Sequence, residues 1–147
     1  MVVVGIGNPL RADDGAGPYL VKLLQNKVPA LLIDAGSVPE NYLEQILVHK
    51  PEAIVLVDAA YMGETPGTYK LIPDTLLPET SFSTHQISLK VFVALLRGMC
   101  PAPVYVLGIE PKITDFKEEL STEVRNGVER LAAEMTAPVG VSGGKGE

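Results

Sequence analysis

The sequence predicts an α/β protein: a three-layer α/β/α sandwich around a mostly parallel five-stranded sheet, with one antiparallel strand at an edge. Short apolar segments rich in β-branched residues alternate along the chain with longer segments whose apolar residues recur at helical spacing. This alternation is typical of a parallel sheet covered by helices. The first segment, residues 2–6, is apolar on both of its faces, as expected of a central strand.

Five segments carry the strand pattern. Four of them are apolar throughout and are expected to be the parallel strands. The fifth alternates between apolar and polar residues and lies between Pro66 and Pro73, which predicts an antiparallel strand at an edge. The predicted strands are residues 2–6, 30–33, 53–57, 104–108 and, at the edge, 67–72.

Four segments carry the helix pattern. Residues 14–25 form the first predicted helix. Ser37 and Glu40 form a capping box for the second, which continues through residues 42–47. A similar box of Ser83 and Gln86 begins the third, which ends at Gly98. The last helix is predicted to begin at Ser121 and to continue through residue 135.

The chain of 147 residues is long enough for one domain with a full hydrophobic core. We expect residues 1–136 to form this single α/β domain. Residues 137–147 are rich in glycine and lack a hydrophobic face, which predicts a disordered C-terminal tail.

Composition excludes several classes of protein. The net charge of −6 disfavours a nucleic-acid partner, which usually meets a basic surface. No apolar segment is long enough to cross a bilayer, so membrane insertion is not expected. Cys100 is the single cysteine, so no intrachain disulfide is possible and a cytoplasmic location is expected. Cys100 lies beside Pro101, away from the predicted crevice, and a covalent thiol mechanism is not expected.

The segment after the first strand carries a cluster of glycines and two adjacent carboxylates, Asp13 and Asp14. A dinucleotide-binding loop is disfavoured, because Leu10 stands where the third glycine is needed and two carboxylates would repel a pyrophosphate. One carboxylate is expected to cap the following helix. The other is then free to face the crevice at the carboxyl edge of the sheet, or to bind a cation or a polar substrate there.

Topology predicts that three polar side chains converge at this edge. Asp14 follows the first strand, Asp58 ends the third, and His85 is expected at the start of a helix. Two carboxylates and a neutral imidazole suit a divalent metal such as nickel or zinc. The residues alone leave simpler roles open, since an aspartate at a strand end is often a loop cap and a histidine at a helix start is often a surface residue.

Four segments of the chain, GIGNPLRADDGAG, VDAA, STHQIS and VLGIEP, resemble the maturation endopeptidases of nickel–iron hydrogenases. The proteases of group-4, formate-lyase-type hydrogenases look most similar, and they are classed as aspartic-type peptidases. The resemblance places nickel-sensing and catalytic roles on Asp14, Asp58 and His85. The turn that begins at Asp34 is similar to the family's Asp-Gly-Gly-Thr, which adds Asp34 as a candidate catalytic residue, although Ala35 departs from the pattern.

The resemblance implies an enzyme that removes the C-terminal extension of a hydrogenase large-subunit precursor once nickel has been inserted. The nickel would arrive on the cysteine thiolates of the precursor, so no tightly held intrinsic cofactor is expected, and a monomer is expected. One alternative is a non-catalytic chaperone that recognises the nickel site. Another is a peptidyl-tRNA hydrolase, because GIGNP resembles the start of that family, yet RADDGAG stands where that family has Thr-Arg-His-Asn.

Overall fold

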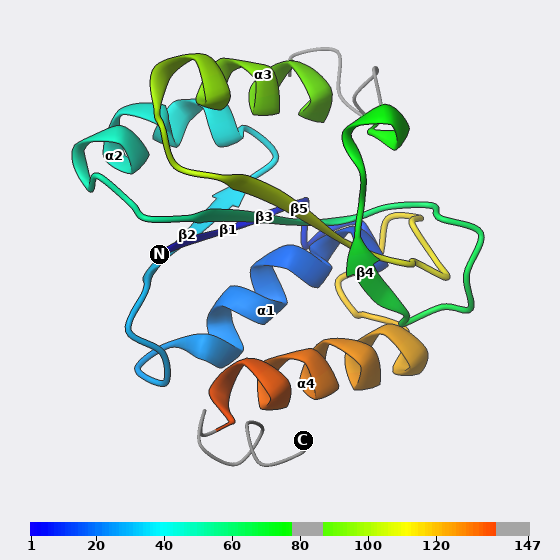
Figure 1. Ribbon diagram of the computed structural model, residues 1–147. Coiled ribbons are helices and arrows are strands. Elements are labelled where there is room, and N and C mark those ends of the chain that lie inside the picture. The colour runs from blue at the N-terminus through cyan, green and yellow to red at the C-terminus, as the bar shows by residue number, and fades with distance from the viewer. Residues whose placement is uncertain (78–86, 138–147) are drawn as a thin grey trace, which may run out of the picture.

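The computed structural model describes residues 1–77 and 87–137 and confirms the predicted α/β fold (Figure 1). Five strands form one sheet in the order β2-β1-β3-β5-β4. The four longer strands are mutually parallel, and β4 pairs antiparallel with β5 at the edge, as predicted. The strands are β1 (Val2–Ile6), β2 (Leu31–Gly36), β3 (Ile54–Ala59), β4 (Tyr69–Leu71) and β5 (Val104–Ile109).

Helices cover both faces of the sheet and complete the three layers (Figure 1). One face packs against α1 (Ala16–Leu24) and α4 (Thr122–Thr136), and the other against α2 (Leu43–Val48) and α3 (Leu89–Met99). Alternation along β1 divides its fully buried side chains between the two cores. Val2 and Val4 face α2 and α3, whereas Val3 faces α1 and α4.

Two strands extend further toward the carboxyl edge than their apolar segments predict. β2 continues to Gly36 and β3 to Ala59, so Asp34 and Asp58 lie inside strands rather than in the loops that follow. Because successive side chains of a strand point to opposite faces, each aspartate is thereby assigned to one face of the sheet.

The starts of two helices differ from the prediction. Residues Ala12–Gly15 form a 3₁₀ turn, η1, ahead of α1, so the first α-helix begins at Ala16 rather than at residue 14. A second 3₁₀ turn, η2 (Pro39–Tyr42), precedes α2. Its N-cap is Val38 and no side chain caps it, so the predicted capping box of Ser37 and Glu40 is wrong. Pro39 at the first position explains the difference, because proline favours this place in a helical turn.

The starts of α3 and α4 are both capped by serine. Ser88 accepts a hydrogen bond from the N–H of Val91, so α3 begins at Leu89 and the predicted helical Ile87 precedes it. Ser121 caps α4 as predicted, with its hydroxyl accepting from the N–H of Val124 at 3.3 Å. The predicted box of Ser83 and Gln86, and residues 138–147 of the predicted tail, lie outside the described residues.

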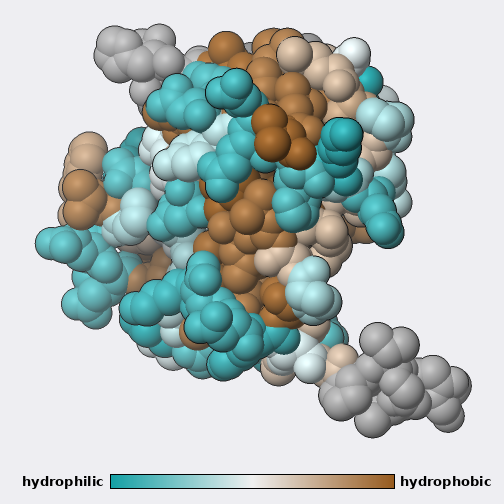
Figure 2. Space-filling model, turned by 90° about the vertical axis from the view of Figure 1, so that its left-hand side faces the viewer, coloured by the Kyte–Doolittle hydropathy of each residue, from teal (hydrophilic) through white to brown (hydrophobic). Residues whose placement is uncertain are grey.

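Figure 2 shows the side of the molecule where α2 and the N-terminus lie, opposite the carboxyl ends of the parallel strands. A band of hydrophobic residues crosses this side between hydrophilic ones (Figure 2). Met1 and Val48, at the beginning of the chain and the end of α2, are among the large hydrophobic residues that stay exposed. Within the two described stretches of chain, none of the helices has the length and hydropathy needed to span a membrane.

Candidate active site

Glycines bring the start of α1 against the carboxyl ends of β1 and β3. A Cβ atom at Gly17 would lie 2.5 Å from the carbonyl oxygen of Val57 and 2.6 Å from that of Ile6. Gly7 has a φ of +142°, and a side chain there would collide with the backbone of Asp14. The close approach therefore depends on glycine at both positions, and it sets the turn that carries Asp14 beside the strand that carries Asp58.

Asp14 and Asp58 form a pair of carboxylates at this edge. Asp14 lies in η1 and is 8% exposed, and its Oδ2 accepts a hydrogen bond from the N–H of Asn8 at 2.8 Å. Burial raises the pKa of Asp14, while this hydrogen bond and the charge of Arg11 oppose the rise. The pKa of Asp58 is raised well above its ordinary value, first by burial and then by the charge of Asp14, against a hydrogen bond from the N–H of Ala59. The structure thus brings Asp14 and Asp58 close enough for the charge of one to act on the other.

This pairing defines what the site can do chemically. The charge of Asp14 raises the pKa of Asp58, and a divalent cation between two such carboxylates stabilises both in the ionised form. Burial raises the pKa of both carboxyl groups, and the pKa of Asp58 is raised further by the charge of Asp14. The pair therefore provides an acid and a base, or two ligands for a metal.

Asp13, the neighbour of Asp14, has a structural role that the sequence did not predict. Its carboxylate is fully buried and accepts four hydrogen bonds. Lys112 and Ile113 donate from their backbone N–H groups at 2.9 and 2.8 Å, and Ser121 donates from its N–H at 2.7 Å and from its hydroxyl at 2.8 Å. Asp13 thus fastens η1 to the segment before α4. No side chain caps η1 or α1, so the prediction that Asp13 or Asp14 caps the first helix is wrong.

Glu110 fixes the loop that follows Asp58. This buried residue comes directly after β5, and its Oε1 accepts hydrogen bonds from the N–H groups of Met62 at 2.7 Å and Glu64 at 3.1 Å. The backbone of Glu110 also pairs with Thr68 and Gly67 at 2.8 and 2.9 Å. Sequence reasoning assigned Glu110 no role, although a glutamate directly after a buried strand was a signal. The loop beside Asp58 is consequently held in one conformation.

His85, the third predicted ligand, lies outside the described residues. Ile87 and Ser88, which follow it in the sequence, and α3 lie on the face of the sheet toward which Asp58 points. Within residues 1–77 and 87–137, no group of three histidine, cysteine, aspartate or glutamate side chains is arranged to hold a metal. The described part of the site therefore supplies two of the three predicted ligands.

Asp34 is separated from this pair by the sheet itself. In β2, Ile33 and Ala35 face α2 and α3, so Asp34 between them points to the α1 and α4 side. In β3, Ile54 and Leu56 face α2 and α3, which places Asp58 on that side. Asp34 is exposed, and its Oδ1 accepts from the N–H of Gly36 at 3.2 Å. A catalytic role for Asp34, as expected from the sequence, would require this residue to lie beside Asp14 and Asp58, and the structure does not bring the three together.

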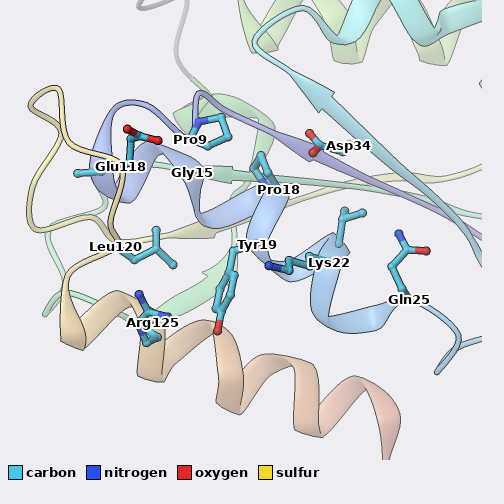
Figure 3. A pocket seen from close by; sticks show the side chains of 12 residues that line it. Pro9, Gly15, Pro18, Tyr19, Lys22, Gln25, Asp34, Glu118, Leu120 and Arg125 are labelled. Carbon is cyan, nitrogen blue, oxygen red and sulfur yellow. The ribbon is translucent and has the colours of Figure 1, made fainter.

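Asp34 instead lines a pocket of about 480 Å³ on the α1 and α4 side (Figure 3). In Figure 3, Tyr19 and Lys22 of α1 and Gln25 directly after it extend along one wall, and Arg125 of α4 lies near Tyr19. Pro9 and Gly15 line the end of the pocket nearest to the turn that carries Asp14. Since Asp58 faces the opposite side of the sheet, this pocket is distinct from the space in front of the carboxylate pair.

The fold and the site together define an α/β protein with a pair of carboxylates at the carboxyl edge of a mostly parallel sheet. Comparison with known proteins places it more closely. Residues 18–137 match the family model of the HycI hydrogenase maturation proteases, and the chain belongs to this family. It is a hydrolase, and the prediction of an endopeptidase is confirmed over the chaperone and peptidyl-tRNA hydrolase alternatives.

Individual relatives agree with the family match. The chain is 32% identical to the hydrogenase 3 maturation protease of Escherichia coli K12 over 133 residues, which cover 88% of this chain and 85% of that protein. The solution structure of the endopeptidase HycI from Escherichia coli has a TM-score of 0.81 at 30% identity, covering 92% and 88% of the two chains. The crystal structure of the [NiFe] hydrogenase maturation protease HycI from Thermococcus kodakarensis has a TM-score of 0.80 at 30% identity, covering 92% and 90%.

Proposed function

We propose that this endopeptidase removes the C-terminal extension of a nickel–iron hydrogenase large-subunit precursor after nickel insertion, and that it recognises the nickel carried by the precursor. The observation that carries the proposal is the pair of Asp14 and Asp58 at the carboxyl edge of the sheet, where Asp14 is buried and its charge raises the pKa of Asp58. With His85 these carboxylates make a ligand set that suits a divalent metal of borderline softness. The metal belongs to the substrate.

In this proposal the carboxylate pair distinguishes nickel-loaded precursor from nickel-free precursor. Two like charges close together are unfavourable, and they raise the pKa of Asp58 in the free enzyme. Nickel on the precursor stabilises both carboxylates in the ionised form. A precursor without nickel offers no such compensation, and it binds less tightly for that reason.

Binding of the nickel also places the scissile peptide at the edge of the sheet, where hydrolysis takes place. Attack by water requires a base that accepts a proton and a group that stabilises the tetrahedral oxyanion. A carboxylate oxygen of Asp14 or Asp58 that does not contact the metal can act as the base, and the metal can polarise the carbonyl or the water. Glu110 contributes by fixing the loop of residues 60–67 beside Asp58.

The direct test is incubation of the enzyme with nickel-loaded and nickel-free large-subunit precursor, followed by mass spectrometry of the products. We expect the nickel-loaded form alone to lose its C-terminal extension. We expect Asp14→Asn, Asp58→Asn and His85→Ala each to slow cleavage by at least about 100-fold, because each removes one ligand bond to the same metal. Equal cleavage of both precursor forms would contradict nickel recognition.

Two control variants match the test. His49→Ala removes a solvent-exposed histidine at the C-terminal end of α2. Glu52→Gln neutralises an exposed carboxylate just before β3, at the amino ends of the parallel strands and thus opposite to Asp58. Both should cut at the parent rate. Binding of the nickel-loaded precursor without any cleavage by the parent enzyme would contradict the proposal. A monomeric state and a cytoplasmic location remain predictions from the sequence.

A further inference from the structure

Three large hydrophobic side chains stay exposed at the carboxyl edge of the sheet. Leu10 is 55% exposed, Tyr61 63% and Phe116 82%, and Phe116 is the most exposed large hydrophobic residue that the structure describes. They lie in the segments that follow β1, β3 and β5, three parallel strands whose carboxyl ends meet at this edge (Figure 1). We call these three residues the apolar rim. Single exposed hydrophobic residues are ordinary, whereas a group of them at one place marks an interaction site.

Hydrogen bonds place Leu10 and Phe116 beside the turn that carries Asp14. The N–H of Leu10 donates to the side chain of Asn8 at 2.9 Å, and the N–H of Asn8 donates to the carboxylate of Asp14 at 2.8 Å. The carbonyl of Leu10 accepts a hydrogen bond from the N–H of Lys117 at 3.0 Å. Phe116, the neighbour of Lys117, therefore lies next to the same turn.

Two further contacts hold the aromatic members of the rim in place. The hydroxyl of Tyr61 is 3.2 Å from the hydroxyl of Thr114, which is a hydrogen-bonding distance. The guanidinium of Arg11 lies 5.4 Å from the centre of the Phe116 ring, within the range of a cation–π contact. The Nε of Arg11 also donates to the carbonyl of Thr114 at 3.2 Å. Because both rings are held in the free enzyme, less side-chain entropy is lost when a partner binds them.

The size of a protein interface places the rim inside the area that a precursor covers. A stable interface buries about 800 Å² on each partner, which corresponds to a disc with a radius of roughly 16 Å. The carboxylate pair lies near the centre of this disc when it binds the nickel of the precursor. Tyr61 follows Asp58 by three residues, so their Cα atoms are at most about 11 Å apart. Leu10 precedes Asp14 by four residues, which limits their separation to about 15 Å.

We propose that the apolar rim is the surface on which the hydrogenase precursor docks, through an apolar region around its cleavage site. The inference rests on the proposed function, since it takes the carboxylate pair as the place of cleavage. The pair contacts only the nickel and the peptide next to it, whereas an interface of ordinary size needs further contacts. Exposed aromatic side chains that become buried are typical of the residues that contribute most to such an interface. The rim does not depend on the metal, so it contributes to the binding of nickel-loaded and nickel-free precursor alike.

Substitutions in the rim separate docking from chemistry. We expect Phe116→Ala to weaken Kd for nickel-free precursor about tenfold. It should raise KM for nickel-loaded precursor by about the same factor and leave kcat unchanged, because the contact is the same in the ground state and the transition state. Phe116→Leu keeps a large apolar side chain and should stay within about threefold of the parent. Tyr61→Ala and Leu10→Ala should each weaken Kd by roughly threefold or more. All four variants should unfold within about 2 °C of the parent, since these side chains are mostly exposed.

Val48→Ala and Met99→Ala are matched controls. Both remove exposed apolar side chains from the ends of α2 and α3, which precede β3 and β5 at the opposite edge of the sheet. Both variants should keep the parental Kd and KM. Kd is measured by biolayer interferometry with nickel-free precursor, and KM and kcat by mass spectrometry with nickel-loaded precursor.

The two measurements allow the two proposals to fail separately. Equal cleavage of both precursor forms would contradict nickel recognition, while a tenfold weaker Kd for Phe116→Ala would still support the rim. If the parent does not cleave, Kd alone decides, and if nickel-free precursor does not bind, KM alone decides. Parental Kd and KM for Phe116→Ala and Tyr61→Ala, or an equal loss in the two controls, would overturn the docking proposal. A dimer of the parent in sedimentation velocity that Phe116→Ala dissociates, with a parental Kd for precursor, would assign the rim to a second copy of this chain and overturn it too.

Discussion

The adjacent carboxylates Asp13 and Asp14 should respond in opposite ways to the same substitution. Asp13→Asn replaces an acceptor of four hydrogen bonds by an amide, whose NH₂ group must face backbone donors of Lys112 and Ile113 or of Ser121. Asp14→Asn keeps an oxygen that can accept from Asn8 and removes a buried charge. The first change should therefore destabilise the fold, and the second should leave it stable while abolishing cleavage.

The contacts of Asp13 set the size of the effect. Each buried donor that loses its acceptor costs about 1–3 kcal/mol. The more favourable orientation of the amide places NH₂ at the position of Oδ1 and leaves one donor, the N–H of Ser121, without an acceptor, so we expect a loss of roughly 1–3 kcal/mol in the free energy of unfolding. Domains of this size are stable by about 5–15 kcal/mol, and 1 kcal/mol corresponds to roughly 2–4 °C in Tm. Asp13→Asn should accordingly lower Tm by about 2–12 °C.

Thermal unfolding followed by circular dichroism, together with guanidinium titration at the same pH, measures this loss for both variants. The parent and Asp14→Asn should unfold within about 3 °C of one another, and Asp14→Asn should show little or no cleavage of nickel-loaded precursor. A parental Tm for Asp13→Asn would refute the assignment of Asp13 as the anchor of η1. A stable Asp13→Asn variant without activity would mean that the two aspartates have exchanged roles.

Three further predictions follow from the same region. Burial and the charge of Asp14 raise the pKa of Asp58 in the folded state, so the contribution of Asp58 to stability is greatest below its unfolded pKa and decreases as pH rises through the folded pKa. In metal-free urea titrations between pH 4 and 8, Asp58→Asn should therefore gain stability relative to the parent as pH rises. A stability difference that does not depend on pH would contradict the raised pKa. Glu110→Met should lower Tm and make the backbone amides of Met62 and Glu64 exchange faster with deuterium. Glu110→Gln keeps the accepting oxygen and should behave like the parent. Equal exchange rates in both variants would show that the loop does not depend on Glu110. Gly17→Ala should lower Tm by several degrees or prevent folding, because its Cβ would meet the backbone oxygens of Val57 and Ile6, and a parental Tm would show that α1 can move away from the sheet.

Much of the fold could be predicted because its signals are local. The apolar strands, the serine cap of α4 and the proline-bounded edge strand each depend on a few neighbouring residues. The start of α2 was also locally encoded, but two signals conflicted. Ser37 and Glu40 have the spacing of a capping box, and Pro39 between them favours Val38 as the N-cap instead. The proline prevails because its fixed φ already suits the first position of the turn.

The candidate site could be predicted only in part, because some of its features depend on distant segments. Topology was sufficient to bring Asp14 and Asp58 to one edge. The distinction between Asp13 and Asp14 required the position of residues 112–121, about 100 residues further along the chain. The separation of Asp34 from Asp58 required the true end of β2, since a shift of one residue in a strand moves a side chain to the other face.

The hydrogen bonds of Asp13 also bear on when the active site forms during synthesis. Residue 13 is among the first to leave the ribosome, yet its acceptor oxygens are satisfied by Lys112, Ile113 and Ser121, which are 99 to 108 positions later. Contacts this remote in sequence form late in folding, and during translation they must wait for the later segment to be made. An incomplete chain can therefore form the first strands of the sheet while η1, which carries Asp13 and Asp14, still lacks its hydrogen bonds to residues 112–121. The peptidase becomes competent to cut only when nearly all of its own chain has been synthesised and folded.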